Sequence, residues 1–268
     1  MSAKVATHVC RVLEHRWVNA RYKYLRLSCP GEIALRTAAG QFFQLACPVS
    51  EAEAPFLRRP MSVYGIGPEP DGIEFLYHVK GAGTRSLEQL PAGASLSIIG
   101  PLGVGFSFSP DWKRILLVAR GVGLATMAPL VPLAARSGVA LTAVLSARSS
   151  ADLMREEFLR GAHANVHAVF DADGTSALDR VEPLLARLLA EESPDMVYTC
   201  GSNRLLALLQ TLGARGEVAL EQQMACGMGV CLSCVRLFRQ GGDRVFRRVC
   251  CEGPVFALDS VDGDVQFG

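Results

Sequence analysis

The chain has 268 residues, of which half are hydrophobic and a fifth are charged, and its formal net charge is +1. This length predicts two domains with room for a small third, and the apolar content is enough to form substantial cores. The balanced charge, without a basic run or interleaved aromatic and basic residues, argues against a nucleic-acid partner.

The location of the protein is predicted from its first residues and its cysteines. Residues 1–8 lack the apolar stretch of a secretory signal. Nine cysteines in such a chain indicate reduced thiols and metal ligands. We therefore expect a cytoplasmic protein.

The first region, residues 1–108, alternates short apolar runs with turns. Many short strands at this spacing are typical of an antiparallel barrel or sandwich. The clearest predicted strands cover residues 24–27, 41–45, 73–79 and 95–98.

The second region, residues 109–216, begins with a continuous apolar run over 114–119. Such a run is typical of a parallel sheet that is covered on both faces. Strands and helices then alternate, which predicts βαβ units. The further predicted strands are 139–145, 166–170 and 196–200, and the predicted helices include 151–159 and 177–190.

The remaining residues, 217–268, are too few for a core of their own, so we expect them to fold around a metal. The predicted fold is therefore α+β and multidomain, with an antiparallel β-barrel, an α/β parallel-sheet domain and a small C-terminal segment.

One long apolar segment, residues 115–147, requires a comparison with membrane helices. Arg120 and Arg136 bracket only fifteen uncharged residues, which glycines and prolines interrupt. A membrane-spanning helix needs about twenty apolar residues. We therefore predict a buried strand, turn, helix and strand, and no membrane span.

The segment Arg59-Pro60-Met61-Ser62 lies in the barrel region and is expected to precede a strand at 63–65. The guanidinium fork of an arginine can pair with a diphosphate. The hydroxyl of Ser62, three residues on, could meet the polar edge of a ring system. Taken alone, the segment also fits an ordinary surface arginine.

Gly81, Gly83 and Thr84 open a predicted helix over residues 85–90. Glycines let the backbone approach a phosphate, and the free amides at the start of a helix attract an anion. A simple turn in which Thr84 caps the helix is the other interpretation.

Two motifs lie at the ends of predicted parallel strands. Gly121 and Gly123 follow the first of these strands, where dinucleotide-binding folds place a pyrophosphate, although the third glycine of the full motif is replaced by Thr126. Cys200 ends the last predicted strand, at the sheet edge where ligands bind. A half-buried core cysteine is the alternative for Cys200.

The strongest motif is the group of cysteines near the end of the chain. Cys226, Cys231 and Cys234 have the C-x4-C-x2-C spacing, and a fourth thiol follows at Cys250 or Cys251. This is the plant-type ferredoxin spacing for a [2Fe–2S] cluster. We expect the fourth ligand to come from a distant strand.

The cysteines have two other interpretations. Structural zinc sites usually show two short C-x2-4-C pairs, whereas only Cys231 and Cys234 make such a pair here. Disulfides or scattered core thiols are the second alternative.

In their order along the chain, these motifs resemble the ferredoxin-NADP reductase superfamily. The cysteine segment, with Leu220-Glu221-Gln222-Gln223-Met224 before it and Gly253-Pro254-Val255-Phe256 after it, looks like the electron-transfer subunit of class 1B dihydroorotate dehydrogenase. The motifs are Gly40-Gln41-Phe42-Phe43, Arg59-Pro60-Met61-Ser62, Gly81-x-Gly83-Thr84, Gly100-Pro101-Leu102-Gly103, Gly121-x-Gly123 and Cys200-Gly201.

The resemblance implies that the barrel, residues 1–108, binds FAD. Segment Arg59-Pro60-Met61-Ser62 would contact FAD, with Arg59 at the phosphates and Ser62 near the reactive edge of the flavin. Gly81, Gly83 and Thr84 would bind the diphosphate.

The resemblance also implies that residues 109–216 receive NAD(H) and that residues 217–268 hold the [2Fe–2S] cluster. Gly121 and Gly123 would form the nicotinamide-nucleotide turn, and Cys200 would approach the nicotinamide as the catalytic residue. The implied cluster ligands, taken from the alignment on Gly253-Pro254-Val255-Phe256, are Cys226, Cys231, Cys234 and Cys250.

Electrons would then run between NAD(H), FAD, the cluster and the flavin of a separate catalytic dehydrogenase subunit, plausibly for dihydroorotate, in a heterotetramer. The same cofactors could serve a different partner oxidoreductase. A redox sensor or scaffold is a further alternative, favoured by Arg120 and Thr126, which stand where the family usually has Gly and Pro. A cation at position 120 could strengthen phosphate binding or crowd it.

Overall fold

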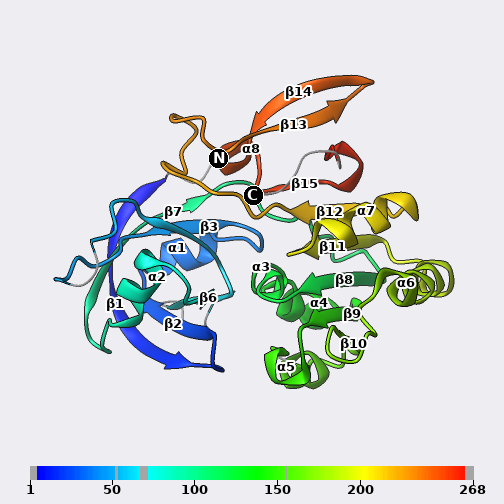
Figure 1. Ribbon diagram of the computed structural model, residues 1–268, viewed down its shortest axis with the longest axis horizontal. Helices are drawn as coiled ribbons and strands as arrows, with labels where there is room; N and C mark the ends of the chain where they lie inside the picture. Colours follow the sequence, from blue (N-terminus) through cyan, green and yellow to red (C-terminus); the bar gives the residue numbers. More distant parts are fainter. Residues whose placement is uncertain (1–4, 52–53, 67–71, 155, 263–268) are drawn as a thin grey trace.

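The computed structural model describes residues 5–51, 54–66, 72–154 and 156–262. These residues form a curved antiparallel sheet, a mostly parallel sheet with helices on both faces, and a C-terminal hairpin (Figure 1). The predicted α+β fold class, with its barrel, its parallel sheet and its C-terminal segment, is confirmed.

The N-terminal sheet has seven strands in the order β4-β3-β7-β1-β2-β6-β5 and curves into a half-barrel (Figure 1). Side chains alternate along β1, where Cys10 and Val12 are buried and Val9 and Leu13 are exposed, as the two-residue period of a strand requires. Helix α1 (Gly31–Arg36) connects β2 to β3, and helix α2 (Ala82–Glu88) connects β6 to β7. Its strands are β1 (Ala6–Trp17), β2 (Tyr22–Ser28), β3 (Phe42–Leu45), β4 (Arg59–Ser62), β5 (Gly65–Ile66), β6 (Gly72–His78) and β7 (Ser95–Leu102).

Two local predictions in the barrel were wrong. The strand expected at 63–65 is replaced by β4 and β5, because Arg59–Ser62 itself pairs with β3. The helix expected at 85–90 is α2, which begins earlier. The Thr84 hydroxyl accepts hydrogen bonds from the amides of Lys80 (3.0 Å) and Gly81 (3.1 Å), so this side chain caps the helix from inside its first turn.

The second sheet has the order β10-β9-β8-β11-β12-β15, and all its pairings are parallel except that of β12 with β15. Its parallel strands are β8 (Arg114–Arg120), β9 (Ala140–Ala147), β10 (Asn165–Phe170), β11 (Met196–Cys200) and β12 (Gly216–Ala219). The β-α alternation predicted for this region is thus confirmed.

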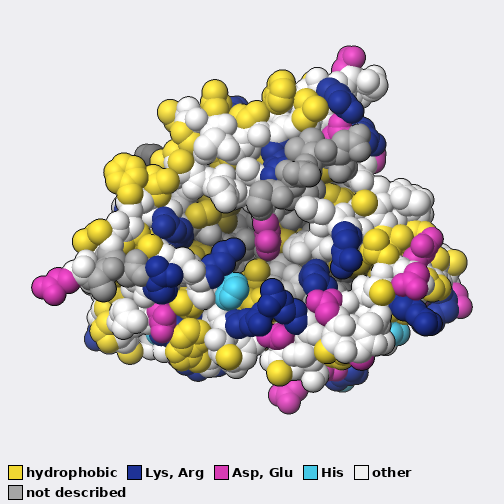
Figure 2. All heavy atoms as spheres, in the orientation of Figure 1, with side chains coloured by type: hydrophobic (Ala, Val, Ile, Leu, Met, Phe, Trp, Pro, Cys, Tyr) yellow, Lys and Arg dark blue, Asp and Glu magenta, His cyan; other side chains and the backbone are white. Residues whose placement is uncertain are grey.

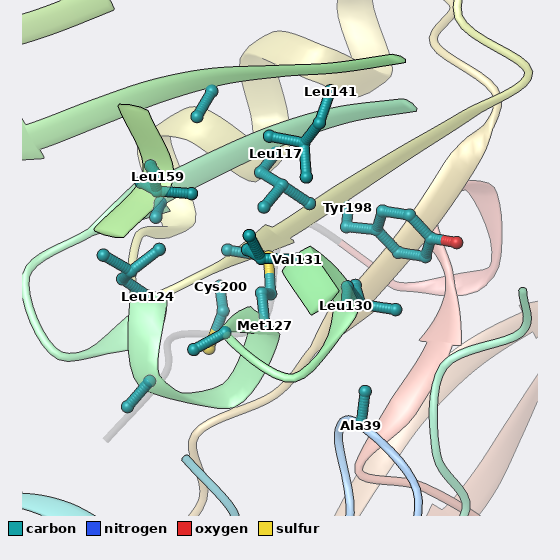
Figure 3. Packing of buried hydrophobic residues seen from close by; sticks show 14 of the residues in the cluster. Ala39, Leu117, Leu124, Met127, Leu130, Val131, Leu141, Leu159, Tyr198 and Cys200 are labelled. Carbon is teal, nitrogen blue, oxygen red and sulfur yellow. The ribbon is translucent and has the colours of Figure 1, made fainter. Parts of the chain in front are cut away.

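Two layers of helices cover this sheet, and β8 shows why its sequence is continuously apolar. Ile115 and Leu117 belong to a core shared with α3, α4 and α5, whereas Leu116 and Val118 belong to a core shared with α6 and α7. Figure 3 shows the first of these cores around Leu117, Met127 and Cys200. The helices are α3 (Gly123–Met127), α4 (Leu130–Ser137), α5 (Glu156–Gly161), α6 (Leu178–Glu192) and α7 (Asn203–Thr211).

The helix expected at 151–159 is not continuous. The 3-10 helix η1 (Ser150–Asp152) ends at Leu153, whose backbone is extended (ψ 130°), and α5 begins at Glu156. The extended residue separates the two helical turns.

The C-terminal segment is attached to the parallel sheet instead of standing apart. Strands β13 (Val235–Gln240) and β14 (Asp243–Arg248) form a hairpin, α8 (Val249–Glu252) follows, and β15 (Val255–Ala257) pairs with β12 before the 3-10 helix η2 (Leu258–Ser260). The ring centroids of Phe238 and Phe256 are 4.2 Å apart, and both rings lie in the same core as α6 and α7. A segment too short for its own core therefore shares one.

Among the helices of the described residues, none is long and apolar enough to cross a membrane.

Candidate functional site

A cavity of about 310 Å³, the central cavity, lies where the half-barrel, the parallel sheet and the start of the C-terminal segment meet. The barrel contributes β4 and the end of β6, the parallel sheet contributes Thr126 and Cys200, and the C-terminal segment contributes Glu221 and Met224. The cavity therefore brings together residues that are more than 160 positions apart in the sequence.

The barrel wall of this cavity is built from β4 and the start of α2. All four residues of β4 and Thr84 line the cavity. Gly83 packs directly on the Arg59 side chain, and a Cβ at position 83 would lie only 2.6 Å from Cζ of the guanidinium. Gly83 thus gives Arg59 its space beside the helix N-terminus. Gly81 has open space around it.

The opposite wall is built around Cys200 at the end of β11. A Cβ at position 123 would lie 2.5 Å from the carbonyl carbon of Cys200, so the turn after β8 packs against β11 only with glycine there. Gly121 has a positive φ of 53°. A Cβ at this position would lie 3.5 Å from the hydroxyl oxygen of Tyr22. The glycine turn after β8 and Cys200 are therefore in contact.

Cys200 is buried, and its thiol lies among neutral and acidic neighbours. Its Sγ donates to Thr126 Oγ1 at 3.7 Å and lies 4.0 Å from Glu221 Oε1. Burial, with a further contribution from the Glu221 charge, raises the pKa of Cys200. The side chain is therefore a neutral thiol and not a thiolate nucleophile.

Glu221 was not predicted from the sequence and lies at the junction of three cavities. Burial raises the pKa of its carboxyl group, with Lys80 opposing this effect. Burial disfavours the charged form of a carboxyl group, so Glu221 takes up a proton more readily than an exposed glutamate does. In the sequence Glu221 belongs to the motif Leu220-Glu221-Gln222-Gln223-Met224, but nothing in that motif indicates a role for its carboxyl group.

The four predicted cluster cysteines form two pairs of neighbouring thiols. Cys226 neighbours Cys231, and Cys234 neighbours Cys250, which also lies beside Cys251. In the part of the chain that the structure describes, no three His, Cys, Asp or Glu side chains converge on a single metal ion. Two thiol pairs match the needs of two irons that take two thiolates each.

Backbone amides point at these sulfurs. The amide of Met228 donates to Cys226 Sγ at 3.3 Å, and that of Gly229 donates to Cys250 Sγ at 3.1 Å. Hydrogen bonds to the sulfurs help to set the reduction potential of an iron–sulfur cluster. The loop obtains them through Gly227 and Gly229, whose φ values are 71° and 80°.

The acidity of the thiols differs across the loop. A side-chain hydrogen bond with Ser233 is the first cause that lowers the pKa of Cys231 to about 6. Burial and the neighbouring Cys234 raise the pKa of Cys250. Cys250 lies on α8 and not on a strand, so the expected origin of the fourth thiol was wrong.

Cys251 lies beside this group, with its Sγ 3.8 Å from that of Cys250. It approaches Gly229 so closely that a Cβ there would collide with its sulfur. The amide of Gly229 nevertheless points at Cys250.

Residues 221–262 match the family model of the iron-sulfur cluster binding domain of dihydroorotate dehydrogenase B. The electron transfer subunit of dihydroorotate dehydrogenase B (NAD(+)) from Shouchella clausii is 32% identical over 228 residues, which cover 83% of this chain and 85% of that protein. The subunit from Listeria monocytogenes is also 32% identical, covering 89% of this chain and 93% of its own.

The chain belongs to the family of dihydroorotate dehydrogenase B electron transfer subunits. The resemblance inferred from the sequence is therefore confirmed. All four predicted cluster cysteines of this electron transfer subunit, and Glu221, fall inside the matched domain.

Solved structures agree on the fold of the electron transfer subunit. A chain of the NADH-dependent reduced ferredoxin-NADP oxidoreductase superposes with a TM-score of 0.77 at 23% identity, covering 98% of this chain and 92% of that one. Ferredoxin-NADP+ reductase from Plasmodium falciparum gives a TM-score of 0.61 at 12% identity, covering 76% of this chain and 88% of its own.

Proposed function

We propose that this chain carries electrons between NAD(H) and a partner dihydroorotate dehydrogenase subunit through FAD and a [2Fe–2S] cluster. The observation that carries the proposal is the central cavity, which joins the predicted FAD segment, Cys200 and the start of the cluster-binding segment. A hydride brings two electrons at once and a cluster takes one, and a flavin supplies the conversion when it is bound.

The barrel wall of the cavity supports binding of FAD. Arg59 provides a guanidinium fork for the diphosphate, with Gly81, Gly83 and Thr84 beside it at the start of α2. Met61, Leu76 and Tyr77 provide apolar area for a ring system, and Ser62 provides a hydroxyl at its edge.

The opposite wall supports an approach of the nicotinamide to Cys200. The neutral thiol and the Thr126 hydroxyl offer a small, uncharged surface for the ring. Glu221 Oε1 lies 4.0 Å from Cys200 Sγ, and burial, which raises the pKa of Glu221, makes this carboxyl group easier to protonate than an exposed one.

The thiol pairs Cys226–Cys231 and Cys234–Cys250 would hold the cluster, one pair on each iron. The choice of Cys250 over Cys251 is supported by the amide of Gly229, which already donates to the Cys250 sulfur.

The loop of residues 226–234, the cluster loop, also supports docking of the catalytic subunit. Val230 is 81% exposed, and Leu232 and Met228 expose about half of their side chains around the thiols. An apolar surface around a redox centre suits a partner that must approach closely to receive electrons. From the family membership we further propose a heterotetramer of two catalytic and two electron transfer subunits.

The domains are residues 1–108 for FAD, 109–216 for NAD(H) and 217–268 for the cluster. Residues 1–4 and 263–268, at the outer ends of this division, lie outside the described part. The complex is cytoplasmic.

Reconstitution tests this function directly. The purified electron transfer subunit is combined with a catalytic dihydroorotate dehydrogenase flavoprotein subunit, and dihydroorotate-dependent reduction of NAD+ is followed by absorbance. The proposal expects turnover only when both chains are present. Turnover by the catalytic subunit alone, or no turnover by the loaded pair, would contradict it.

A further inference from the structure

A second cavity, of about 250 Å³, opens between the half-barrel and the parallel sheet. Its barrel side is formed by Arg21, Tyr22 and His78, and its sheet side by the chain directly after β8 and β9. In open α/β sheets the carboxyl ends of the strands form the ligand crevice. The cavity also shares lining residues, among them His78 and Glu221, with the central cavity.

The charge of this second cavity is mainly positive. Three guanidinium groups line it, those of Arg21, Arg120 and Arg148, against the carboxyl groups of Asp152 and Glu221. Figure 2 shows dark-blue Lys and Arg side chains gathered around a histidine at the centre of this face. Arg21 and Arg120 are partly buried and Arg148 is exposed. Guanidinium groups gathered at the carboxyl edge of a parallel sheet favour a phosphate-bearing ligand.

The three arginines differ in how far they are already engaged. Arg120 forms a two-point ion pair with Asp171, at 3.1 and 2.7 Å, and donates to the Ser146 hydroxyl at 2.7 Å. Arg21 lies 3.8 Å from a carboxylate oxygen of Asp152. Arg148 pairs with no carboxylate among the described residues, so its guanidinium is available for a ligand.

This distribution explains the unusual residue at position 120. The Arg120 guanidinium fork faces Asp171 at the end of β10 and is held there by three hydrogen bonds. It therefore fixes the ends of β8, β9 and β10 relative to one another. Arg120 is a positioning residue here, and phosphate binding falls to its neighbours.

We propose that Arg148, assisted by Arg21, binds the diphosphate of the nicotinamide dinucleotide between the half-barrel and the parallel sheet. The inference rests on the proposed function and adds the side chains that recognise the nucleotide. Gly121 supplies a turn without a Cβ beside these guanidinium groups. A dinucleotide bound here extends past the lining residues that the two cavities share and reaches Cys200.

Neighbouring titratable groups should respond to the ligand. Burial is the first cause that lowers the pKa of His78, and the charges of Lys80, Arg21 and Arg148 lower it further. A bound diphosphate would offset those charges and favour the imidazolium form.

The test measures binding of ADP and of NADH by titration calorimetry to protein loaded with FAD and cluster. The variants are Arg148→Ala, Arg148→Lys and Arg21→Ala, with Arg136→Ala as the control, since Arg136 is exposed near the end of α4. Loss of a charge-assisted bond should raise the ADP dissociation constant roughly tenfold to a hundredfold in Arg148→Ala. The ADP dissociation constant of Arg148→Lys should lie between those of Arg148→Ala and the unmodified protein. That of Arg136→Ala should match the unmodified protein.

The FAD-to-protein ratio, read from absorbance, separates the two possible diphosphates. The inference expects this ratio to stay unchanged in every variant. Loss of FAD from Arg148→Ala would assign the cavity to the flavin and overturn the inference. Equal ADP affinity in Arg148→Ala and the unmodified protein would also overturn it, while leaving the proposed function intact. Failure of the unmodified protein to bind either nucleotide would contradict the NAD(H) step itself.

Discussion

The cluster loop and the central cavity are built in opposite ways. The proposed cluster site takes three of its four cysteines and its amide donors from residues 226–234, and the fourth cysteine from α8. The cavity takes its walls from β4, β11 and the residues after β12, which meet only through the packing of two sheets. A local site should depend on single ligands, whereas an assembled site should depend on the residues that let its walls approach.

The local character of the cluster loop predicts the largest effect. Cys250→Ala should abolish the cluster, because Cys250 pairs with Cys234 and accepts the Gly229 amide, whereas Cys251→Ala should keep it. Iron content and visible circular dichroism measure the outcome. Cluster loss in Cys251→Ala with retention in Cys250→Ala would reverse the assignment of the fourth ligand.

The assembled character of the cavity is tested at Gly83. In Gly83→Ala the new Cβ would overlap the Arg59 guanidinium, which must then leave its position beside α2. We expect FAD affinity to fall roughly tenfold or more, as for other substitutions that overpack a close contact. Fluorescence titration of the apoprotein with FAD measures this. Gly161→Ala is the control, since position 161 has open space around it; equal losses in both variants would show a general effect of adding the methyl group.

The attachment of the hairpin to the rest of the chain is tested at Asp262. Its carboxylate is 1% exposed and pairs with Arg239 and Arg244, each at 3.1 Å. Asp262→Ala should lower the free energy of unfolding by about 2–3 kcal/mol, because it removes the buried partner of two cations. Glu191→Ala, which breaks an exposed pair with Arg187, should cost under about 0.5 kcal/mol. Similar denaturant midpoints for the two variants would contradict this difference.

The smallest effect concerns the ion pair at the edge of the second cavity. The Arg120 guanidinium, first through its hydrogen bonds, lowers the pKa of Asp171 to about 2. A lowered carboxyl pKa contributes stability above the unfolded value of about 4, and this contribution is lost as the pH falls through about 2. Because the pair is partly exposed, the contribution should be below about 1 kcal/mol. The difference in unfolding free energy between the unmodified protein and Asp171→Asn should therefore shrink between pH 5 and pH 2. A difference that stays constant over this range would show that the charge of Asp171 is not its source.

The sequence predicted the parts of the molecule that depend on neighbouring residues. The cysteine spacing, the continuous apolar run of β8 and the glycine turn after it each have a physical reason that lies within a few positions. Glu221, Arg21 and Arg148 could not be found in this way, because a charged residue after a strand or in a turn has many ordinary uses. Only the packing of the half-barrel against the parallel sheet places them around shared cavities. Arg120 shows the same limit, since its partner Asp171 lies 51 positions away.

The most direct test is an absorption spectrum of the anaerobically purified chain before and after addition of NADH. The proposed route predicts flavin bands together with broad cluster absorbance, and both should bleach when NADH is added. If both chromophores are present and NADH leaves them oxidised, electrons do not enter this chain from NADH, and the proposed function is contradicted at its first step.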